Sequence, residues 1–154
     1  MKKTIFPIIL SLCIGSILSY IIISGYDEID TPVFSKGTQK VYYLRKGIYT
    51  TKENMENEMK DFSHYIYNVE DNKYHSYIAI SKNKKNMQKI KDFYEKMSYN
   101  TYVETKITDN KEFLTVLGQY DEVLSKTDDT NAIKTIVNQV LAKYEEMVNG
   151  EYKN

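Results

Sequence analysis

Apolar and polar positions follow the same pattern twice between residues 41 and 107: a stretch that alternates with a period of two, then a stretch with apolar residues three and four apart. The first pattern is typical of a half-buried strand and the second of an amphipathic helix. The predicted elements are a strand over 41–49, a helix from Thr51, strands over 64–69 and 74–80, a helix from Ser81 and a strand over 100–107. This β-α-β-β-α-β order predicts an α+β, ferredoxin-like fold. Its four-stranded sheet would carry two helices on one face and leave the other face open.

Turn and capping residues support these boundaries. Gly47 is expected to end the first strand, Thr50 or Thr51 to cap the first helix, and Ser81 to cap the second. Residues 68–73 are typical of a hairpin turn between the second and third strands. The apolar positions expected to face the sheet are Met55, Met59, Phe62 and Ile66 from the first helix, and Met87, Ile90, Phe93, Tyr94 and Met97 from the second.

An uninterrupted apolar run precedes this unit. Residues 5–23 carry no charged side chain, and a helix of about 19 residues spans roughly 28 Å, close to the hydrocarbon thickness of a bilayer. Lysines before the run and acidic residues after it predict a single-pass membrane anchor over residues 1–25, with the N-terminus in the cytoplasm and the C-terminal domain extracytoplasmic. A cleaved signal peptide and a lipoprotein signal at Cys13 are alternatives that the length of the run disfavours. Residues 26–39 form a short tether.

Two more helices are expected in a C-terminal helical segment, residues 109–150. The first covers 109–124 and begins at Asp109 or Asn110, and residues 126–129 form a break with a new cap before the second. The apolar positions of the second helix share one face; they are Ile133, Ile136, Val137, Val140, Leu141, Tyr144, Met147 and Val148. This face either packs within the protein, which we favour, or provides a surface for a protein partner or self-association.

Composition excludes several classes of function. Lysine plus arginine equal aspartate plus glutamate at 21 each, so the net charge predicts no nucleic-acid partner. Cys13 is the only cysteine, which excludes an intramolecular disulfide and a thiolate zinc site. Neither His64 nor His75 lies in a metal or nucleophile motif, and the chain has no phosphate loop. We therefore expect no enzyme activity, no catalytic residue, no cofactor and no metal.

Two short motifs carry a resemblance to a known family. The first motif is Arg45-Lys46-Gly47-Ile48-Tyr49 at the end of the first strand, followed by Thr51-Lys52-Glu53-Asn54-Met55 at the start of the first helix. The second motif is Ile78-Ala79-Ile80-Ser81, which ends the third strand ahead of the second helix. Over residues 40–108 this resembles the SPOR domain, a small peptidoglycan-binding module of bacterial division and sporulation proteins. That family has Gln-x-Gly-x-Phe and Ser-x-x-Asn-Ala at the first site and Gly-x-Phe at the second. Arg45 stands at the glutamine and Ala79 at the second glycine.

The resemblance implies a membrane-anchored protein that binds the glycan strands of peptidoglycan, stripped of their stem peptides, during cell division or sporulation. It places the ligand on the open face of the sheet. The residues that match the family's binding positions are Arg45, Ile48, His75, Tyr77 and Val103, and the strand alternation adds Tyr43. Aromatic rings beside hydrogen-bond donors suit sugars, which are apolar on their C–H faces and rich in hydroxyl groups.

The alternative function is a membrane-anchored protein-interaction adaptor of the same machinery that binds no glycan. A wall hydrolase is disfavoured, because the helical segment supplies neither a metal set nor a nucleophile set.

Overall fold

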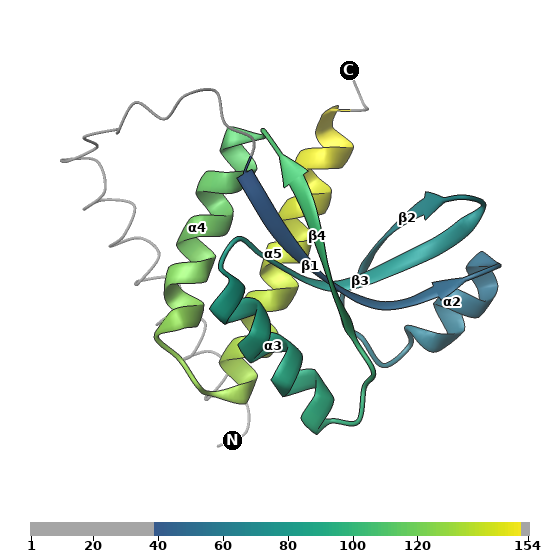
Figure 1. The fold of residues 1–154 in the computed structure, drawn as a ribbon, viewed down its shortest axis with the longest axis horizontal. Coiled ribbons are helices and arrows are strands. Elements are labelled where there is room, and N and C mark those ends of the chain that lie inside the picture. Colours follow the sequence, from purple (N-terminus) through teal and green to yellow (C-terminus); the bar gives the residue numbers. More distant parts are fainter. Residues whose placement is uncertain (1–38, 152–154) are drawn as a thin grey trace, which may run out of the picture. The chain divides into compact units, whose positions relative to one another are not determined.

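The computed structural model describes residues 39–151, which form a four-stranded antiparallel sheet with helices (Figure 1). The elements are β1 (Gln39–Tyr49), α2 (Lys52–Glu58), β2 (Ile66–Glu70), β3 (Lys73–Ser81), α3 (Lys84–Lys96), β4 (Tyr102–Thr108), α4 (Lys111–Ser125) and α5 (Thr130–Glu151). The strand order is β2-β3-β1-β4. The predicted β-α-β-β-α-β order and the two helices after it are confirmed. The predicted anchor and nearly all of the tether lie outside the described residues. Within 39–151, no helix has both the length and the apolar character needed to cross a bilayer.

Three of the four helix starts lie where the sequence predicts a cap. The side chains of Thr51, Asn110 and Asp129 accept hydrogen bonds from the backbone amides of Asn54, Phe113 and Ala132, at 3.2, 2.9 and 2.7 Å. Each side chain thereby satisfies an amide that has no partner within its own helix.

The predicted cap of the second helix, Ser81, is wrong. Asn83 caps α3 and accepts from the amides of Lys85 and Asn86 at 2.9 and 3.4 Å. Ser81 still belongs to β3, and its hydroxyl donates to Asp121 of α4 at 2.5 Å. The local sequence predicts that Ser81 caps the helix, but its hydroxyl instead bonds Asp121, which lies 40 residues later in the chain.

The first helix is shorter than its apolar spacing predicts. Helix α2 ends at Glu58, so Phe62 lies in the following loop and Ile66 begins β2. The ring of Phe62 packs against Tyr94 and Tyr99, with centroids 5.9 and 4.9 Å apart, which fixes this loop on the end of α3. In α3, Met87, Ile90 and Tyr94 are buried as predicted, but the other two predicted positions differ. Phe93 is half-buried, and Met97 follows the last helical residue and is 45% exposed.

Turn chemistry explains the hairpin and the long first strand. Asp71 and Asn72 have φ of 49° and 58°, the left-handed pair required by the two-residue turn between β2 and β3. Gly47 does not end β1, which continues to Tyr49. A Cβ at position 47 would lie 2.5 Å from the Tyr49 hydroxyl oxygen, so the glycine provides room for the tyrosine ring.

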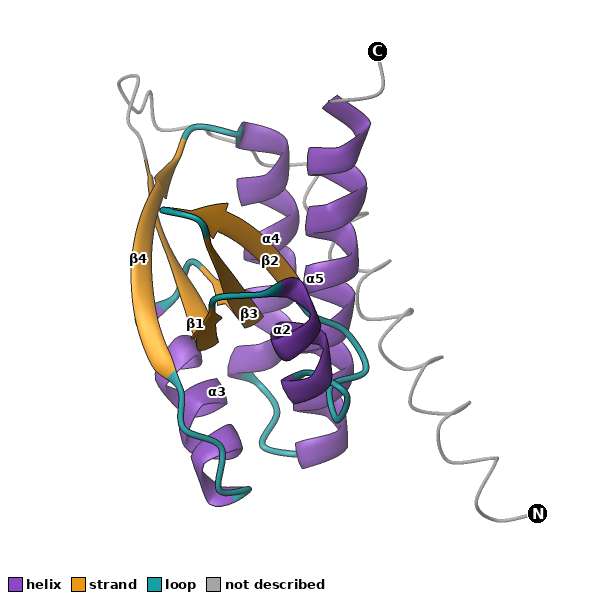
Figure 2. Cartoon of the chain, turned by 90° about the vertical axis from the view of Figure 1, so that its right-hand side faces the viewer, coloured by secondary structure: helices purple, strands orange, loops and turns teal. Residues whose placement is uncertain are grey.

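Helices pack on both faces of the sheet, and the expected open face is open only in part. Helices α2 and α3 pack on β1 and β3, and α5 also packs on β3. Tyr43 and Leu44, adjacent in β1, point to opposite faces, and both are buried. The Tyr43 ring meets Tyr144 of α5 with centroids 6.1 Å apart, so α5 covers the face opposite the one on which α2 and α3 pack. Figure 2 shows α5 to the right of the sheet and α3 at its lower left.

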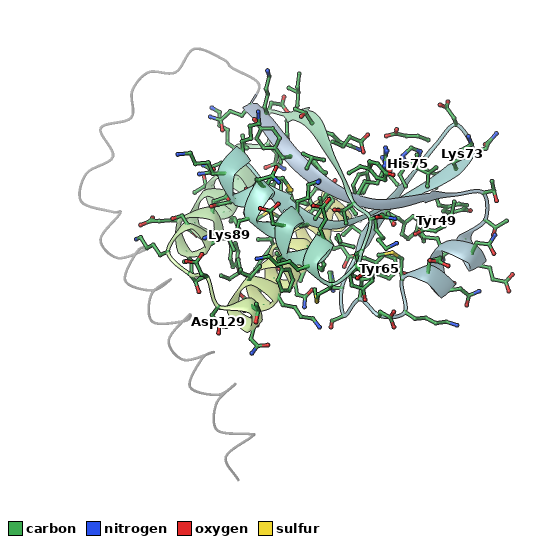
Figure 3. All side chains as sticks on the ribbon, turned by 60° about the horizontal axis from the view of Figure 1, so that its bottom comes forward. Tyr49, Tyr65, Lys73, His75, Lys89 and Asp129 are labelled. Atoms are coloured by element: carbon green, nitrogen blue, oxygen red, sulfur yellow. The ribbon has the colours of Figure 1, made fainter. Side chains whose placement is uncertain are left out.

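The C-terminal helical segment is joined to the sheet by a buried carboxylate. Asp121 of α4 is 6% exposed and accepts from the Ser81 hydroxyl, the Lys82 amide and the Asn86 side-chain amide, at 2.5, 2.8 and 2.9 Å. These donors come from the end of β3 and the start of α3. Lys89 of α3 also binds the α4–α5 connection, through the carbonyls of Leu124 and Thr127 at 3.2 and 3.0 Å. Figure 3 labels Lys89 beside this connection.

Burial raises the pKa of the Asp121 carboxyl above its ordinary value, and the hydrogen bonds from Asn86, Ser81 and Lys82 offset part of that rise. An acid with a raised pKa in the folded state binds its proton more tightly there than in the unfolded chain. The stability that this group contributes is therefore greatest below its unfolded pKa and declines as the pH rises through its folded pKa.

We predict that Asp121→Ala lowers the free energy of unfolding by about 3 kcal/mol, because it leaves several buried donors without their acceptor. Urea unfolding followed by circular dichroism measures the change. Glu122→Ala is the matched control: Glu122 is exposed and contacts only Lys126, a surface pair of small effect. Equal losses in the two variants would show that the Asp121 cluster does not hold the helical segment in place.

Candidate functional site

One face of the sheet, which we call the platform face, carries most of the predicted binding residues. Paired residues on neighbouring antiparallel strands share a face. Arg45 pairs with Tyr77 of β3 and Tyr102 of β4, and Tyr43 pairs with Glu104. At the hairpin end, Ile48, His75 and Asn68 form a row across β1, β3 and β2. Two irregularities in the β1–β3 pairing, between Leu44 and Arg45 and between Arg45 and Gly47, lie in the middle of this surface.

Helix α5 buries the central part of the platform face. Tyr43 and Tyr77 are 6% and 2% exposed. Their rings meet edge to face with centroids 5.5 Å apart, and Tyr144 of α5 contacts both Tyr43 and Phe113 of α4. Burial raises the pKa of both Tyr43 and Tyr77, and the Glu104 carboxylate near Tyr77 adds to the rise there. These two tyrosines are core residues, and neither ring is accessible to an extended polymer.

The rest of the face, from Arg45 to the hairpin, is the open half. Ile48 and Tyr102 are 45% and 59% exposed, whereas Arg45, Asn68 and His75 are half-buried. The Arg45 guanidinium lies 5.8 Å from the centre of the Tyr102 ring and 3.5 Å from the Glu104 carboxylate, so its charge is paired within the sheet. Figure 3 shows His75 and Lys73 at the hairpin end.

Several polar atoms on this half lack a partner. Within residues 39–151, no hydrogen-bond partner is found for Arg45 Nε, Asn68 Oδ1 or His75 Nδ1, although all three atoms are shielded. Shielded polar groups are nearly always satisfied, by protein, water or a ligand. Together they offer hydrogen-bond donors and acceptors from three adjacent strands beside one exposed aromatic ring. That combination can bind an uncharged molecule that is rich in hydroxyl groups.

Lys106 of β4 lies at the boundary between the covered and open halves. Its ammonium group lies 4.7 Å from the ring centre of Tyr77 and 5.4 Å from that of Tyr43. It also lies 3.6 Å from the Glu70 carboxylate, and Lys106 and Asn68 hold the pKa of that carboxyl below its ordinary value. Arg45 and Lys106 are therefore each compensated by a nearby carboxylate, and the exposed Lys73 at the hairpin end adds one positive charge to the open half.

The six predicted site residues therefore divide into three groups. Arg45, Ile48 and His75 lie on the open half, Tyr43 and Tyr77 are buried beneath or beside α5, and Val103 lies on the opposite face because it pairs with Leu44. Tyr102 and Asn68 also lie on the open half, although neither is among the predicted site residues. Tyr102 has the opposite strand parity from Val103, so extending the alternation already used for Tyr43 would have identified it.

The apolar face of α5 is used internally. Ile133, Val137 and Leu141 are 4%, 2% and 0% exposed and pack against α4 and the sheet. The favoured expectation, that this helix packs within the protein, is confirmed. Among the described residues, no group of three His, Cys, Asp or Glu side chains could hold a metal ion.

We predict that Tyr77→Phe leaves the free energy of unfolding unchanged or raises it by up to about 1 kcal/mol, because the mutation removes a buried hydroxyl with no partner. Thermal and urea unfolding measure this. Tyr77→Ala is the contrasting variant and should cost about 4 kcal/mol through the cavity that it leaves. A loss above about 1 kcal/mol in Tyr77→Phe would show that the hydroxyl is satisfied in the folded protein, with the nearby Glu104 carboxylate as its acceptor.

Comparison with known proteins adds no homologue: no protein-family model, no curated protein and no solved structure matches the chain. A functional assignment therefore rests on the geometry of the open half and on the motifs in the sequence.

Proposed function

We propose that this chain is a non-catalytic binding protein of the bacterial cell wall, which binds glycan strands of peptidoglycan through the open half of the platform face. One observation carries the proposal: Arg45, Asn68 and His75 have polar atoms without a protein partner on the face that bears the exposed Tyr102 ring. An aromatic ring can stack on the C–H face of a sugar while neighbouring donors and acceptors bind its hydroxyl groups.

The structure limits how long the bound segment can be. Tyr144 of α5 occupies the space above Tyr43 and closes the central part of the sheet. A glycan on the open half would contact only β1, β3, the hairpin and the edge strand β4, so the site suits a few sugar units rather than a long strand. Such a short contact favours modest affinity and recognition of many equivalent sites along a polymer.

The proposal also includes a membrane anchor, a location outside the cytoplasm and a role in a cellular process. The SPOR-like motifs, the apolar run over residues 5–23 and the predicted orientation together support a single-pass membrane protein. Its sheet domain would lie outside the cytoplasm and act during cell division or sporulation.

A second candidate is a protein-interaction adaptor that binds no glycan. The covered centre of the platform face favours it, since Tyr43 and Tyr77 are unavailable to any ligand. The buried apolar face of α5 is equally unavailable, so an adaptor would have to use the exposed sheet edges.

The two candidates separate in a sedimentation assay of the full chain, in mild detergent, with purified sacculi before and after amidase treatment. We predict that amidase treatment increases binding and that Tyr102→Ala weakens it about tenfold, the scale of one lost aromatic contact. Tyr67→Ala is the matched control, because Tyr67 is also an exposed tyrosine (43%) but lies on the other face. Equal binding by wild type and Tyr102→Ala would contradict the glycan site and favour the adaptor.

A second prediction concerns Arg45, which stands where the SPOR family has glutamine. We predict that Arg45→Gln retains at least half of the glycan affinity, because glutamine keeps a donor and an acceptor at this position, whereas Arg45→Ala weakens binding about tenfold. Titration of fluorescently labelled protein with solubilised glycan chains measures both. If Arg45→Gln and Arg45→Ala bind equally well, position 45 makes no hydrogen bond to the ligand.

A further inference from the structure

Strand β4 forms one edge of the sheet. It pairs with β1 on one side, and its other side has no partner strand among residues 39–151. In Figure 2 it forms the left margin of the sheet, with no described element outside it. The outer N–H and C=O groups of an edge strand are a template for another strand, so proteins protect such edges or use them for pairing.

Four exposed or half-exposed side chains of β4 complement a second copy of the same strand. In an antiparallel pair centred on Thr105, each Glu104 faces Lys106 of the other copy, and each Val103 faces its Ile107. Val103 and Ile107 are 41% and 65% exposed, and both lie on the face opposite the platform. The charged pair lies on the platform face, so apolar residues meet in the 103/107 rows, opposite charges meet in the 104/106 rows, and two threonines meet at the centre.

The charges also select this register. A shift of two residues in one direction would bring Glu104 opposite its own copy, and a shift in the other direction would do the same for Lys106. Like charges directly opposite each other destabilise a strand pair. In the single chain Glu104 and Lys106 reach inward to Arg45 and Glu70, and they keep 28% and 30% of their side chains exposed, so pairing requires each to turn toward the edge or to share its present partner.

We propose that β4 is a self-association edge, at which two copies of this chain pair antiparallel about Thr105 and join their sheets into one. The twofold axis of this pair is perpendicular to the joined sheet. The two platform faces therefore lie on the same side, and the open half of each copy lies beside the covered half of the other, because Tyr102 of one strand is opposite Thr108 of its partner. The inference does not depend on glycan binding, since it uses the strand edge and the residues of β4 alone.

Cysteine cross-linking of the full chain in mild detergent tests the register. In a Cys13→Ser background, Thr105→Cys places two thiols opposite each other, within disulfide reach, and is expected to form covalent dimers on mild oxidation. Val103→Cys alone is expected not to do so, because its copies would be about 13 Å apart along the strands. A mixture of Val103→Cys and Ile107→Cys chains is expected to form the mixed dimer.

Two results would overturn the proposal. One is a Thr105→Cys thiol that reacts with maleimide but gives no dimer. The other is Val103→Cys dimerising as fast as Thr105→Cys, which would indicate random collision.

Charge reversal supplies an independent test in the Thr105→Cys background. Glu104→Lys is expected to slow cross-linking about tenfold, because the symmetry turns two ion pairs into two like-charge pairs. Adding Lys106→Glu in the same chain restores opposite charges on both rows and is expected to restore the rate. Circular dichroism and the melting temperature establish that each variant is folded. A double variant as slow as the single one would contradict the pairing.

Discussion

The buried carboxylate of Asp121 determines what kind of domain this chain forms. It accepts hydrogen bonds from the last residue of β3, from the residue that follows and from the first turn of α3. These bonds fix α4 against the end of β3, and α4 in turn positions α5 over the platform face. Without that attachment the sheet would have one covered face and one open face, as its element order alone predicts. With it, the sheet lies between helices, and only its hairpin end keeps a solvent-exposed platform.

Local sequence signals predict the elements well, because the forces that form them are local. Period-two alternation, the cap at Thr51 and the Asp71–Asn72 turn involve groups only a few residues apart, and the structure has each of them. Two of the predictions that failed involve a distant partner, whereas the predicted end of β1 at Gly47 failed because of Tyr49, two residues away. Ser81 donates its hydrogen bond to Asp121 instead of capping α3. Phe62 lies outside α2 and packs on Tyr94 and Tyr99.

The candidate site was also predictable only where it depends on local signals, and not where it depends on residues distant in the sequence. Parity along β1 identifies which residues share a face with Arg45, and Tyr102 follows from the same rule once the pairing of β4 is known. Nothing in the residues near Tyr43 indicates that its ring will be covered, because the covering residue, Tyr144, lies about a hundred positions later in the chain. The two pairing irregularities around Arg45 also depend on the match between β1 and β3, and neither strand encodes them alone.

The position of α5 has a consequence for where this domain begins and ends. A unit of roughly 70 residues buries too little apolar surface to be more than marginally stable. Here the missing core comes from the helices that follow, because Tyr43 and Tyr77 are shielded by residues beyond the last strand. A fragment cut after Thr108, where the β-α-β-β-α-β pattern is complete, would expose two tyrosine rings and leave Ser81 without its acceptor. Helix α5 thus covers part of the platform face and completes the core at the same time, so the smallest piece that can be transplanted into another protein includes α5.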